Sequence, residues 1–405
     1  MTRSPRRFAL ALLLAPIACG DDADPAAGAD AGTLDGDGDG DGDGDGDGDG
    51  DGDGSSGGDD VACGPSVVRD VVAPDVAVLS GLTVADDGLV VLVSDPAFVA
   101  PTTIDRVGFD GGGRTTIHTS TERRRVVSVF AFGDTAYFLE RDDAAVIPVG
   151  ELWRVPLAGG AAERVGDAAF EEAAILGVDA DGIFVRRGTI DPVGSVFERI
   201  DPTSGVVTTV GASVDTGTPL QPRVTADDLV FVVGGVGADA GGPQRVFALP
   251  KRGQDGTPVE LWTVDVADDP CGFPLGGLFP TPTRLACGFS GVATRALDGT
   301  MPEVLIDPDP LLPLNVLVAT DAETLYVIET VPNTSRDGHM SRLTTDDPTR
   351  TAVTCELGKV ANRVVDGFFP NQTEWEVRVG PADVYWIEES FDGTTVRSAI
   401  RAAPK

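Results

Sequence analysis

Residues 136–160 read AYFLERDDAAVIPVGELWRVPLAGG and contain the pattern that decides the fold. A short aromatic and apolar run, 136–139, is followed by a polar loop. A second run, 152–155, carries an arginine and leads through Pro156 to the glycine pair Gly159 and Gly160. Short apolar runs separated by polar and glycine-rich turns are typical of antiparallel strands. The stretch therefore predicts two neighbouring strands and the start of a hairpin.

The same pattern recurs along the chain. Seven strand cores can be recognised, at 89–92, 136–139, 183–185, 230–232, 285–287, 325–328 and 384–387. The first three intervals, measured at Val90, Tyr137, Phe184 and Phe231, are each 47 residues, and the later intervals of 55, 40 and 59 are less regular. Arginine-bearing runs follow at 104–107, 152–155, 197–200, 244–246, 293–296 and 341–343. Internal repetition of this length indicates one supersecondary unit per repeat.

Each repeat is predicted to be an inner strand, the aromatic strand, the arginine-bearing strand, a glycine hairpin and an outer strand. A single four-stranded sheet cannot bury both faces, but sheets packed radially can. The sequence therefore predicts an all-β fold, a β-propeller of four-stranded blades over residues 63–405, with seven blades and six or eight as alternatives. The last repeat runs out after its third strand, and residues 67–72 can supply the missing outer strand.

Three of the cores resemble a known class of repeat. Segments 137–140, 326–329 and 385–388 read YFLE, YVIE and YWIE. They are similar to YWTD repeats of the low-density-lipoprotein-receptor type and to exported, TolB-like propeller lipoproteins of bacteria. YWTD propellers have six blades, whereas this chain has seven cores. The resemblance implies that the acid in each motif is a structural group that bonds to the adjoining blade.

Charged residues also mark a candidate ligand-binding rim. Glu140, Glu329 and Glu388 each stand three residues after the tyrosine of their repeat, and Arg187 has the same place after Phe184. Equivalent positions in a propeller emerge at the same rim. A ring of carboxylates at a channel mouth could bind a cation or a basic partner. The alternative is the structural role that the resemblance implies.

The N-terminus has the features of an export signal. Residues 1–18 combine three arginines, an apolar run over 8–15 that is too short to span a bilayer, and a small residue, Ala18, before Cys19. This end resembles the lipidation site of bacterial lipoproteins, in which Cys19 would carry the lipid. We therefore expect an exported lipoprotein of the outer membrane or cell surface, on its periplasmic or extracellular face. The alternative is a plainly secreted protein in which Cys19 is incidental.

Residues 19–62 are predicted to be a linker. Ten consecutive Asp-Gly pairs run from Asp35 to Gly54. Such a segment has great backbone freedom, strong self-repulsion and no apolar side chain to bury, which favours a disordered, extended spacer. Its spacing also suggests an EF-hand loop, but glycine stands at position twelve, where the bidentate glutamate belongs. Loose association with calcium remains the alternative, and calcium is the one cofactor that the sequence suggests.

Charge and cysteine content limit the function classes. The net charge is −35, which excludes nucleic acid as a partner. Besides Cys19 there are four cysteines, and in an oxidising compartment they allow three pairings. We favour Cys271 with Cys287, which flank one short β segment, and hence Cys63 with Cys355. The chain has two histidines and no CxxC motif, so a zinc site is not expected.

The sequence assigns no catalytic, cofactor-binding or metal-binding residue. It contains no GxSxG, HExxH or P-loop motif. We therefore expect a monomeric binding or interaction module for a protein, peptide or glycan, rather than an enzyme. One alternative is a hydrolase or lactonase that uses calcium in a central channel lined by Glu, Asn and Asp. Another is a structural envelope protein without a small-molecule site.

Overall fold

The computed structural model describes residues 67–75, 77–95, 101–142, 149–171, 173–190, 193–213, 220–233, 244–264, 277–288, 291–297, 303–306, 314–330, 337–355, 357–364, 373–391 and 394–405. These residues form strands and no helix, so the part of the chain that the structure describes contains no helix able to span a membrane. The predicted signal, Cys19, the Asp-Gly linker, Cys63 and Cys271 lie outside the described residues. Lipidation and both disulfide pairings therefore stay predictions.

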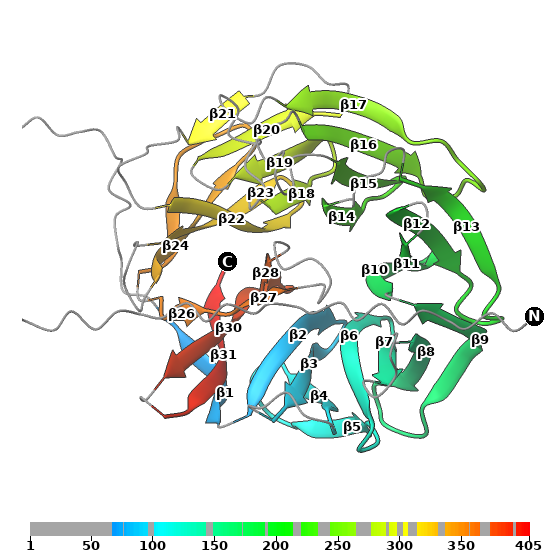
Figure 1. The fold of residues 1–405 in the computed structure, drawn as a ribbon. Helices are drawn as coiled ribbons and strands as arrows, with labels where there is room; N and C mark the ends of the chain where they lie inside the picture. The colour runs from blue at the N-terminus through cyan, green and yellow to red at the C-terminus, as the bar shows by residue number, and fades with distance from the viewer. Residues whose placement is uncertain are drawn as a thin grey trace, which may run out of the picture. The chain divides into compact units, whose positions relative to one another are not determined.

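The described strands form eight antiparallel sheets: one is a two-stranded hairpin, and the other seven are blades that follow one another around a ring (Figure 1). Blade 1 contains β2 (Val78–Ala85), β3 (Gly88–Ser94), β4 (Thr103–Gly108) and β5 (Thr115–Thr119). Blade 2 contains β6 (Arg124–Phe132), β7 (Thr135–Asp142), β8 (Val149–Pro156) and β9 (Glu163–Glu171). Blade 3 contains β10 (Ala173–Asp179), β11 (Gly182–Ile190), β12 (Val193–Ile200) and β13 (Val207–Ala212).

The next three blades repeat the same order of strands from the centre outward. Blade 4 contains β14 (Leu220–Val224), β15 (Asp228–Val233), β16 (Gln244–Pro250) and β17 (Val259–Val264). Blade 5 contains β18 (Gly277–Pro280), β19 (Arg284–Gly288), β20 (Val292–Ala296) and β21 (Glu303–Ile306). Blade 6 contains β22 (Leu314–Asp321), β23 (Thr324–Thr330), β24 (Asp337–Thr344) and β25 (Thr351–Thr354).

Blade 7 joins the two ends of the propeller. Its second strand, β30 (Asp383–Phe391), pairs on its inner edge with β29 (Val377–Val379) and with β26 (Lys359–Val360). The third strand is β31 (Val396–Pro404), and its outer neighbour is β1 (Arg69–Asp75), near the start of the folded chain. Between β26 and β29 lies the two-stranded hairpin of β27 (Asn362–Val364) and β28 (Thr373–Trp375).

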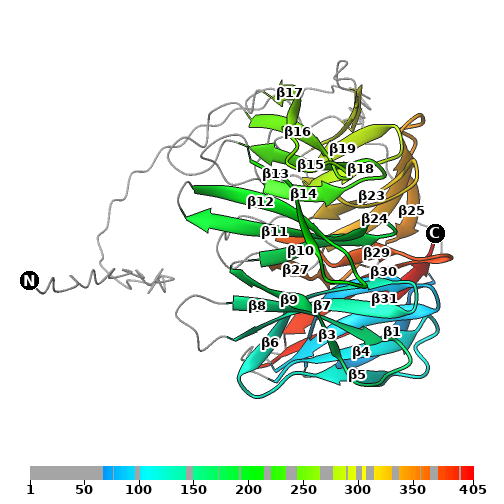
Figure 2. The same cartoon turned by 90° about the vertical axis from the view of Figure 1, so that its right-hand side faces the viewer.

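The N-terminal strand therefore closes the ring, which confirms the prediction that residues 67–72 supply an outer strand. In Figures 1 and 2, the blue β1 lies beside the red β31. The Arg69 guanidinium also binds the Asp383 carboxylate, with 2.6 Å between Nη2 and Oδ2. The inner strands contact one another in order, from β2 through β6, β10, β14, β18 and β22 to β29, and β29 contacts β2. The fold is a closed, seven-bladed β-propeller.

The core lies between the blades, which explains why the second strands are apolar on both faces. Val90 and Leu92 of β3 pack with side chains of blade 2. Leu89 and Val91 of the same strand pack with side chains of blade 7. Because side chains alternate along a strand, each second strand contributes to two neighbouring layers. A strand buried on both faces reads as a continuous apolar run, as the sequence cores do.

The sequence repeat treats Phe184 and Phe231 as equivalent positions, and the structure shows that they are not. Phe184 of blade 3 packs towards blade 4, whereas Phe231 of blade 4 packs back towards blade 3 in the same cluster. Val230 is the residue that packs towards blade 5. The structural counterpart of Phe184 is therefore Val230, one residue before Phe231. A shift of one residue along a strand reverses the face, so a count of equal intervals cannot detect it.

Candidate functional site

The four charged residues of the predicted ligand rim lie on four different blades. Glu140 is on β7, Arg187 on β11, Glu329 on β23 and Glu388 on β30, each near the end of a second strand. The structure does not bring these four side chains together in one cluster. Each of them instead contacts other groups of the protein.

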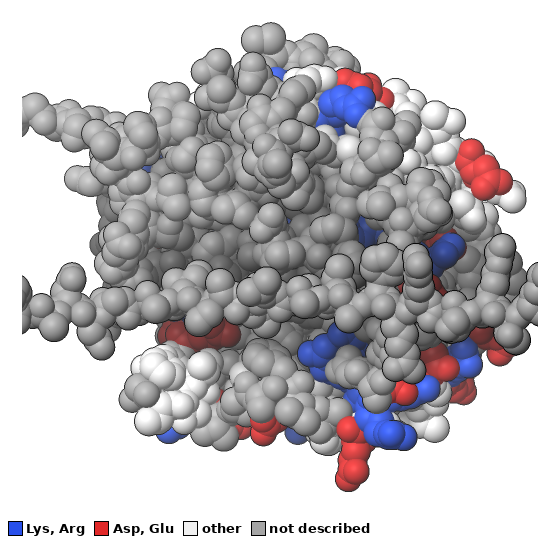
Figure 3. Space-filling view, viewed as in Figure 1, with Lys and Arg blue, Asp and Glu red and all other residues white. Residues whose placement is uncertain are grey.

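Glu140 is buried at the boundary between blades 1 and 2. One carboxylate oxygen lies 3.4 Å from His118 Nε2 on β5, and the other lies 3.5 Å from Arg124 Nη1 on β6. Arg124 also pairs with Glu151 on β8. Contact with the adjoining blade is the role that the YWTD resemblance implies for this acid. Figure 3 shows acidic and basic side chains side by side over the blade of β6 to β9.

The other three residues make comparable contacts. Arg187 Nη2 donates to Glu198 Oε1 over 3.0 Å. Glu388 accepts from Arg401 Nη2 at 3.3 Å and from the Gly358 N–H at 3.2 Å. Glu329 Oε2 lies 3.3 Å from His339 Nε2 and 3.9 Å from Arg350 Nη1, and burial lowers the pKa of His339, against the opposing effect of Glu329. Each of the four residues therefore has at least one protein partner within the described part of the chain.

A different feature, the central channel, combines several polar groups in one cavity. All seven inner strands contribute to a cavity of about 620 Å³. This volume is within the usual range for small-molecule sites, roughly 300 to 1,000 Å³. Most of the described lining is apolar. Its charged members are Arg186, Arg223, Arg378 and Asp179.

Three of the four charged residues in the described lining of the channel are arginines, in a protein that is very acidic as a whole. Arg223 Nε donates to Leu278 O over 3.2 Å, and its guanidinium lies 5.4 Å from the centre of the Phe279 ring. Arg378 Nη1 donates to Val377 O at 2.8 Å and to Trp375 O at 3.2 Å. Arg186 is 3% exposed, and burial lowers its pKa to about 10, so it remains protonated at neutral pH. These contacts fix the orientation of positive charge in the channel.

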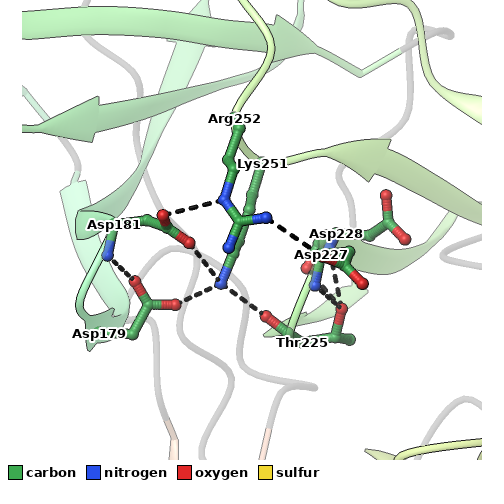
Figure 4. A network of polar contacts seen from close by, with 7 residues as sticks. All are labelled: Asp179, Asp181, Thr225, Asp227, Asp228, Lys251 and Arg252. Atoms are coloured by element: carbon green, nitrogen blue, oxygen red, sulfur yellow. Dashed lines mark hydrogen bonds and ion pairs between the residues drawn. The ribbon is translucent and has the colours of Figure 1, made fainter.

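The acid of the channel lining, Asp179, belongs to a network that joins blades 3 and 4 (Figure 4). Lys251, which is 3% exposed, donates from Nζ to Asp179 Oδ2 at 2.5 Å and to Thr225 O at 3.0 Å, and it lies 3.1 Å from Asp181 Oδ2. Arg252 Nε donates to Asp181 Oδ1 at 2.9 Å. The Asp179 carboxylate therefore forms an ion pair with the buried Lys251.

The network predicts a defined response to acid. Hydrogen bonds from Arg252 and Lys251 lower the pKa of Asp181 to about 2, from 3.8. Because the folded pKa is below the unfolded pKa, this group stabilises the fold fully above about pH 4, and its contribution is lost as pH falls towards 2. We expect the stability difference between the wild type and Asp181→Asn to be constant from neutral pH to about pH 5 and to shrink below pH 4. Unfolding curves across this range, with an NMR titration of the Asp181 carboxyl, measure it. A carboxyl that titrates near 4 would contradict the prediction.

The described part of the channel lining differs from the lining that the calcium-enzyme alternative requires. That alternative requires convergent Glu, Asn and Asp side chains, whereas the described lining carries three arginines and one aspartate. Among the described residues, no group of three or more His, Cys, Asp or Glu side chains is arranged to hold a metal ion.

Sequence reasoning missed the channel arginines, although a signal was present. The strand register places Arg223 opposite Val230 and Arg378 opposite Tyr385, so each arginine precedes its partner by seven residues. The same separation relates Phe130 to Tyr137. Reading the position seven residues before each core would have identified one residue of every inner strand. The inner strands are short and variable in composition, so their sequence pattern is weaker than that of the aromatic cores.

Fold and cavity together define a seven-bladed β-propeller with a central cavity whose described lining carries three arginines and one aspartate. The structure is similar to the β-propeller domain of the trilobed protease from Pyrococcus furiosus, with a TM-score of 0.53, 11% identity, and coverage of 80% of this chain and 97% of that chain. It also resembles a nidogen/laminin complex structure, with TM-score 0.40, 11% identity, and coverage of 64% and 94%. TolB from Acinetobacter baumannii gives TM-score 0.41, 15% identity, and coverage of 67% and 65%.

No protein-family model matches the chain, and no curated protein matches it either. At these identities the likeness to solved structures shows the fold alone.

Proposed function

We propose that this protein is an exported, envelope-anchored binding module that takes a small anionic ligand in its central channel. The observation that supports this function is the placement of Arg186, Arg223 and Arg378 in one cavity of about 620 Å³. A guanidinium presents a planar set of donors that matches carboxylate and phosphate groups. Charge-assisted bonds are stronger in a partly dehydrated cavity than in open water.

The contrast between the charge of the whole chain and the charges that line the cavity supports the proposed selectivity for anions. The chain as a whole carries a net charge of −35. A cavity whose described lining carries three arginines and one aspartate is unexpected from this composition. The cavity walls also include Phe130 and Phe279, which offer apolar contact to the uncharged part of a ligand. Binding of this kind requires no reaction, which agrees with the absence of recognised catalytic motifs.

The location outside the cytoplasm is part of the same proposal. It is supported by the export signal over 1–18 and by the lipid-acceptor position of Cys19, followed by a spacer that would hold the propeller away from a membrane. Mass spectrometry of the exported protein would show a lipid on Cys19. An unmodified Cys19, or an N-terminus elsewhere, would contradict the anchor while leaving the channel site unaffected.

The channel site predicts which compounds stabilise the protein. We expect carboxylates or phosphates to raise the melting temperature of the exported protein, with a rise that grows as the logarithm of ligand concentration above Kd, and we expect uncharged analogues to have no effect. Because a bond to a charged group is worth about 1.5 to 3 kcal/mol, Arg378→Met should weaken binding by roughly ten- to a hundredfold. Thermal shift and calorimetric titration measure both effects.

A matched control is Arg397→Gln, which removes an exposed arginine of β31, outside the channel lining. This variant should bind anions as the wild type does. Stabilisation by calcium or by neutral peptides alone, with no response to any anion, would contradict the proposed function. Equal losses in the two variants would show that the arginines act through overall charge and not through the channel.

A further inference from the structure

One level of the channel has a residue from every inner strand. On each second strand, one residue occupies an equivalent position: Val90, Tyr137, Phe184, Val230, Ala286, Tyr326 and Tyr385. The level consists of the inner-strand residues that pair with these seven residues. In blade order they are Thr83, Phe130, Gly177, Arg223, Phe279, Ala319 and Arg378. All of them except Thr83 line the cavity.

The residue types at this level repeat with an offset of three blades. Phenylalanine stands on blades 2 and 5, a small residue on blades 3 and 6, and arginine on blades 4 and 7. In a ring of seven blades, an offset of three places two residues nearly opposite each other. Arg223 and Arg378 therefore face the cavity from opposite walls, with an aromatic ring between them on either side.

We infer that the channel recognises an elongated ligand with an anionic group at each end and an apolar middle. This inference rests on the proposed function and names the ligand class of the same cavity. One end would bind Arg223 and the other Arg378, while the middle would lie between Phe130 and Phe279. The Arg223 guanidinium is held against the next blade by its bond to Leu278 O and by the Phe279 ring. Arg378 is held on its own blade by Val377 O.

Two linked anionic groups are favoured over two separate anions. Each separate anion loses its own translational and rotational freedom on binding. When the groups are linked and the linker matches the span, the second contact is intramolecular and has a high effective concentration. Affinity should therefore depend on ligand length and pass through a maximum. A single anion has one charged end and cannot use both arginines.

The test is calorimetric titration of the exported protein with linear α,ω-dicarboxylates of increasing length, with matched monocarboxylates and with α,ω-bisphosphates. At the best length, the two-ended ligand should bind at least about tenfold more tightly than its one-ended analogue, with one ligand per protein. Arg223→Met and Arg378→Met should each reduce its affinity to that of the one-ended analogue. Tighter binding of the bisphosphates would support the inference and identify phosphate as the end group.

Further variants and a control distinguish failure of this inference from failure of the proposed function. Arg223→Lys and Arg378→Lys keep the charge but lose the planar donor set, so they test the contact in a protein with unchanged net charge. Arg397→Gln should leave the length dependence intact. Equal affinity of one-ended and two-ended ligands at every length would overturn this inference while leaving the proposed function standing. Failure of every anion to bind would overturn the proposed function itself.

Discussion

Replacement of Glu376 by alanine is expected to lower the free energy of unfolding by about 3 to 5 kcal/mol, because two buried backbone donors would lose their acceptor. Glu376 is 3% exposed and lies just before β29 in blade 7. Its carboxylate accepts the N–H of Gly81 at 2.8 Å and the N–H of Leu82 at 3.0 Å, both in blade 1. These two residues lie at a break in the β2–β3 register, where the ladder does not satisfy their N–H groups.

The position of this carboxylate makes the effect large. It joins the last blade of the propeller to the first. Its loss therefore weakens ring closure as well as leaving donors unpaired. The melting temperature should fall by roughly 5 to 10 °C, as measured by calorimetry together with denaturant unfolding.

Two further variants separate the causes. Glu376→Gln keeps one carbonyl acceptor, so its loss should be smaller than that of the alanine variant. Glu171→Ala removes an exposed glutamate of β9 and should change stability by less than about 0.5 kcal/mol. The Glu389 carboxyl offers an independent readout, since burial and the nearby charge of Glu376 raise its pKa, against Lys359. If Glu376→Ala and Glu171→Ala have the same melting temperature, Glu376 does not stabilise the contact between blades 7 and 1.

The second large effect is expected at Gly205, in the hairpin between β12 and β13. Its φ is +71°, and an added Cβ would lie 2.3 Å from the Cα of Gly166 on β9, in the preceding blade. Gly205→Ala should therefore combine left-handed backbone strain with a clash against backbone. We expect a loss of about 3 to 5 kcal/mol in the free energy of unfolding.

Gly159 provides the matched control for Gly205. Its φ is +86°, but an added Cβ there would meet nothing within 4 Å. Gly159→Ala should thus cost only the backbone strain, about 1 kcal/mol. Denaturant unfolding of both variants gives the difference that is due to contact between blades. Equal losses at the two positions would show that the close approach of blades 2 and 3 does not matter for stability.

Similar close contacts recur at other blade boundaries. A Cβ on Gly111 of blade 1 would lie 2.4 Å from Val71 O on β1, and one on Gly211 of β13 would lie 2.5 Å from Gly256 O in blade 4. In each case, the turn between the third and fourth strands approaches the outer strand of the preceding blade. The sequence predicted glycine hairpins but not the close approach of neighbouring blades at these hairpins. A tight turn favours glycine whether or not another blade lies near it, so the glycine pattern alone does not show the contact.

The roles of individual charged residues were less predictable than the strands. The sequence placed Glu140, Arg187, Glu329 and Glu388 at equivalent positions, and they do occupy second strands. Their partners come from other strands and, for Glu140, from the neighbouring blade. A spacing rule identifies equivalent positions within a repeat. It does not identify the group that each side chain contacts across a boundary.

The amino-acid sequence by itself determined the seven second strands, the four-stranded blades and the N-terminal strand that closes the ring. It could do so because these features depend on local signals: alternation, turn residues and a repeated interval. The tertiary structure alone decided that Val230 and not Phe231 is the counterpart of Phe184, and which residues share one level of the channel. Thr83 and Arg378 stand almost 300 residues apart in the chain, and they come to the same level because the ring closes. The chemistry of the channel is therefore a product of closure, which no single repeat contains.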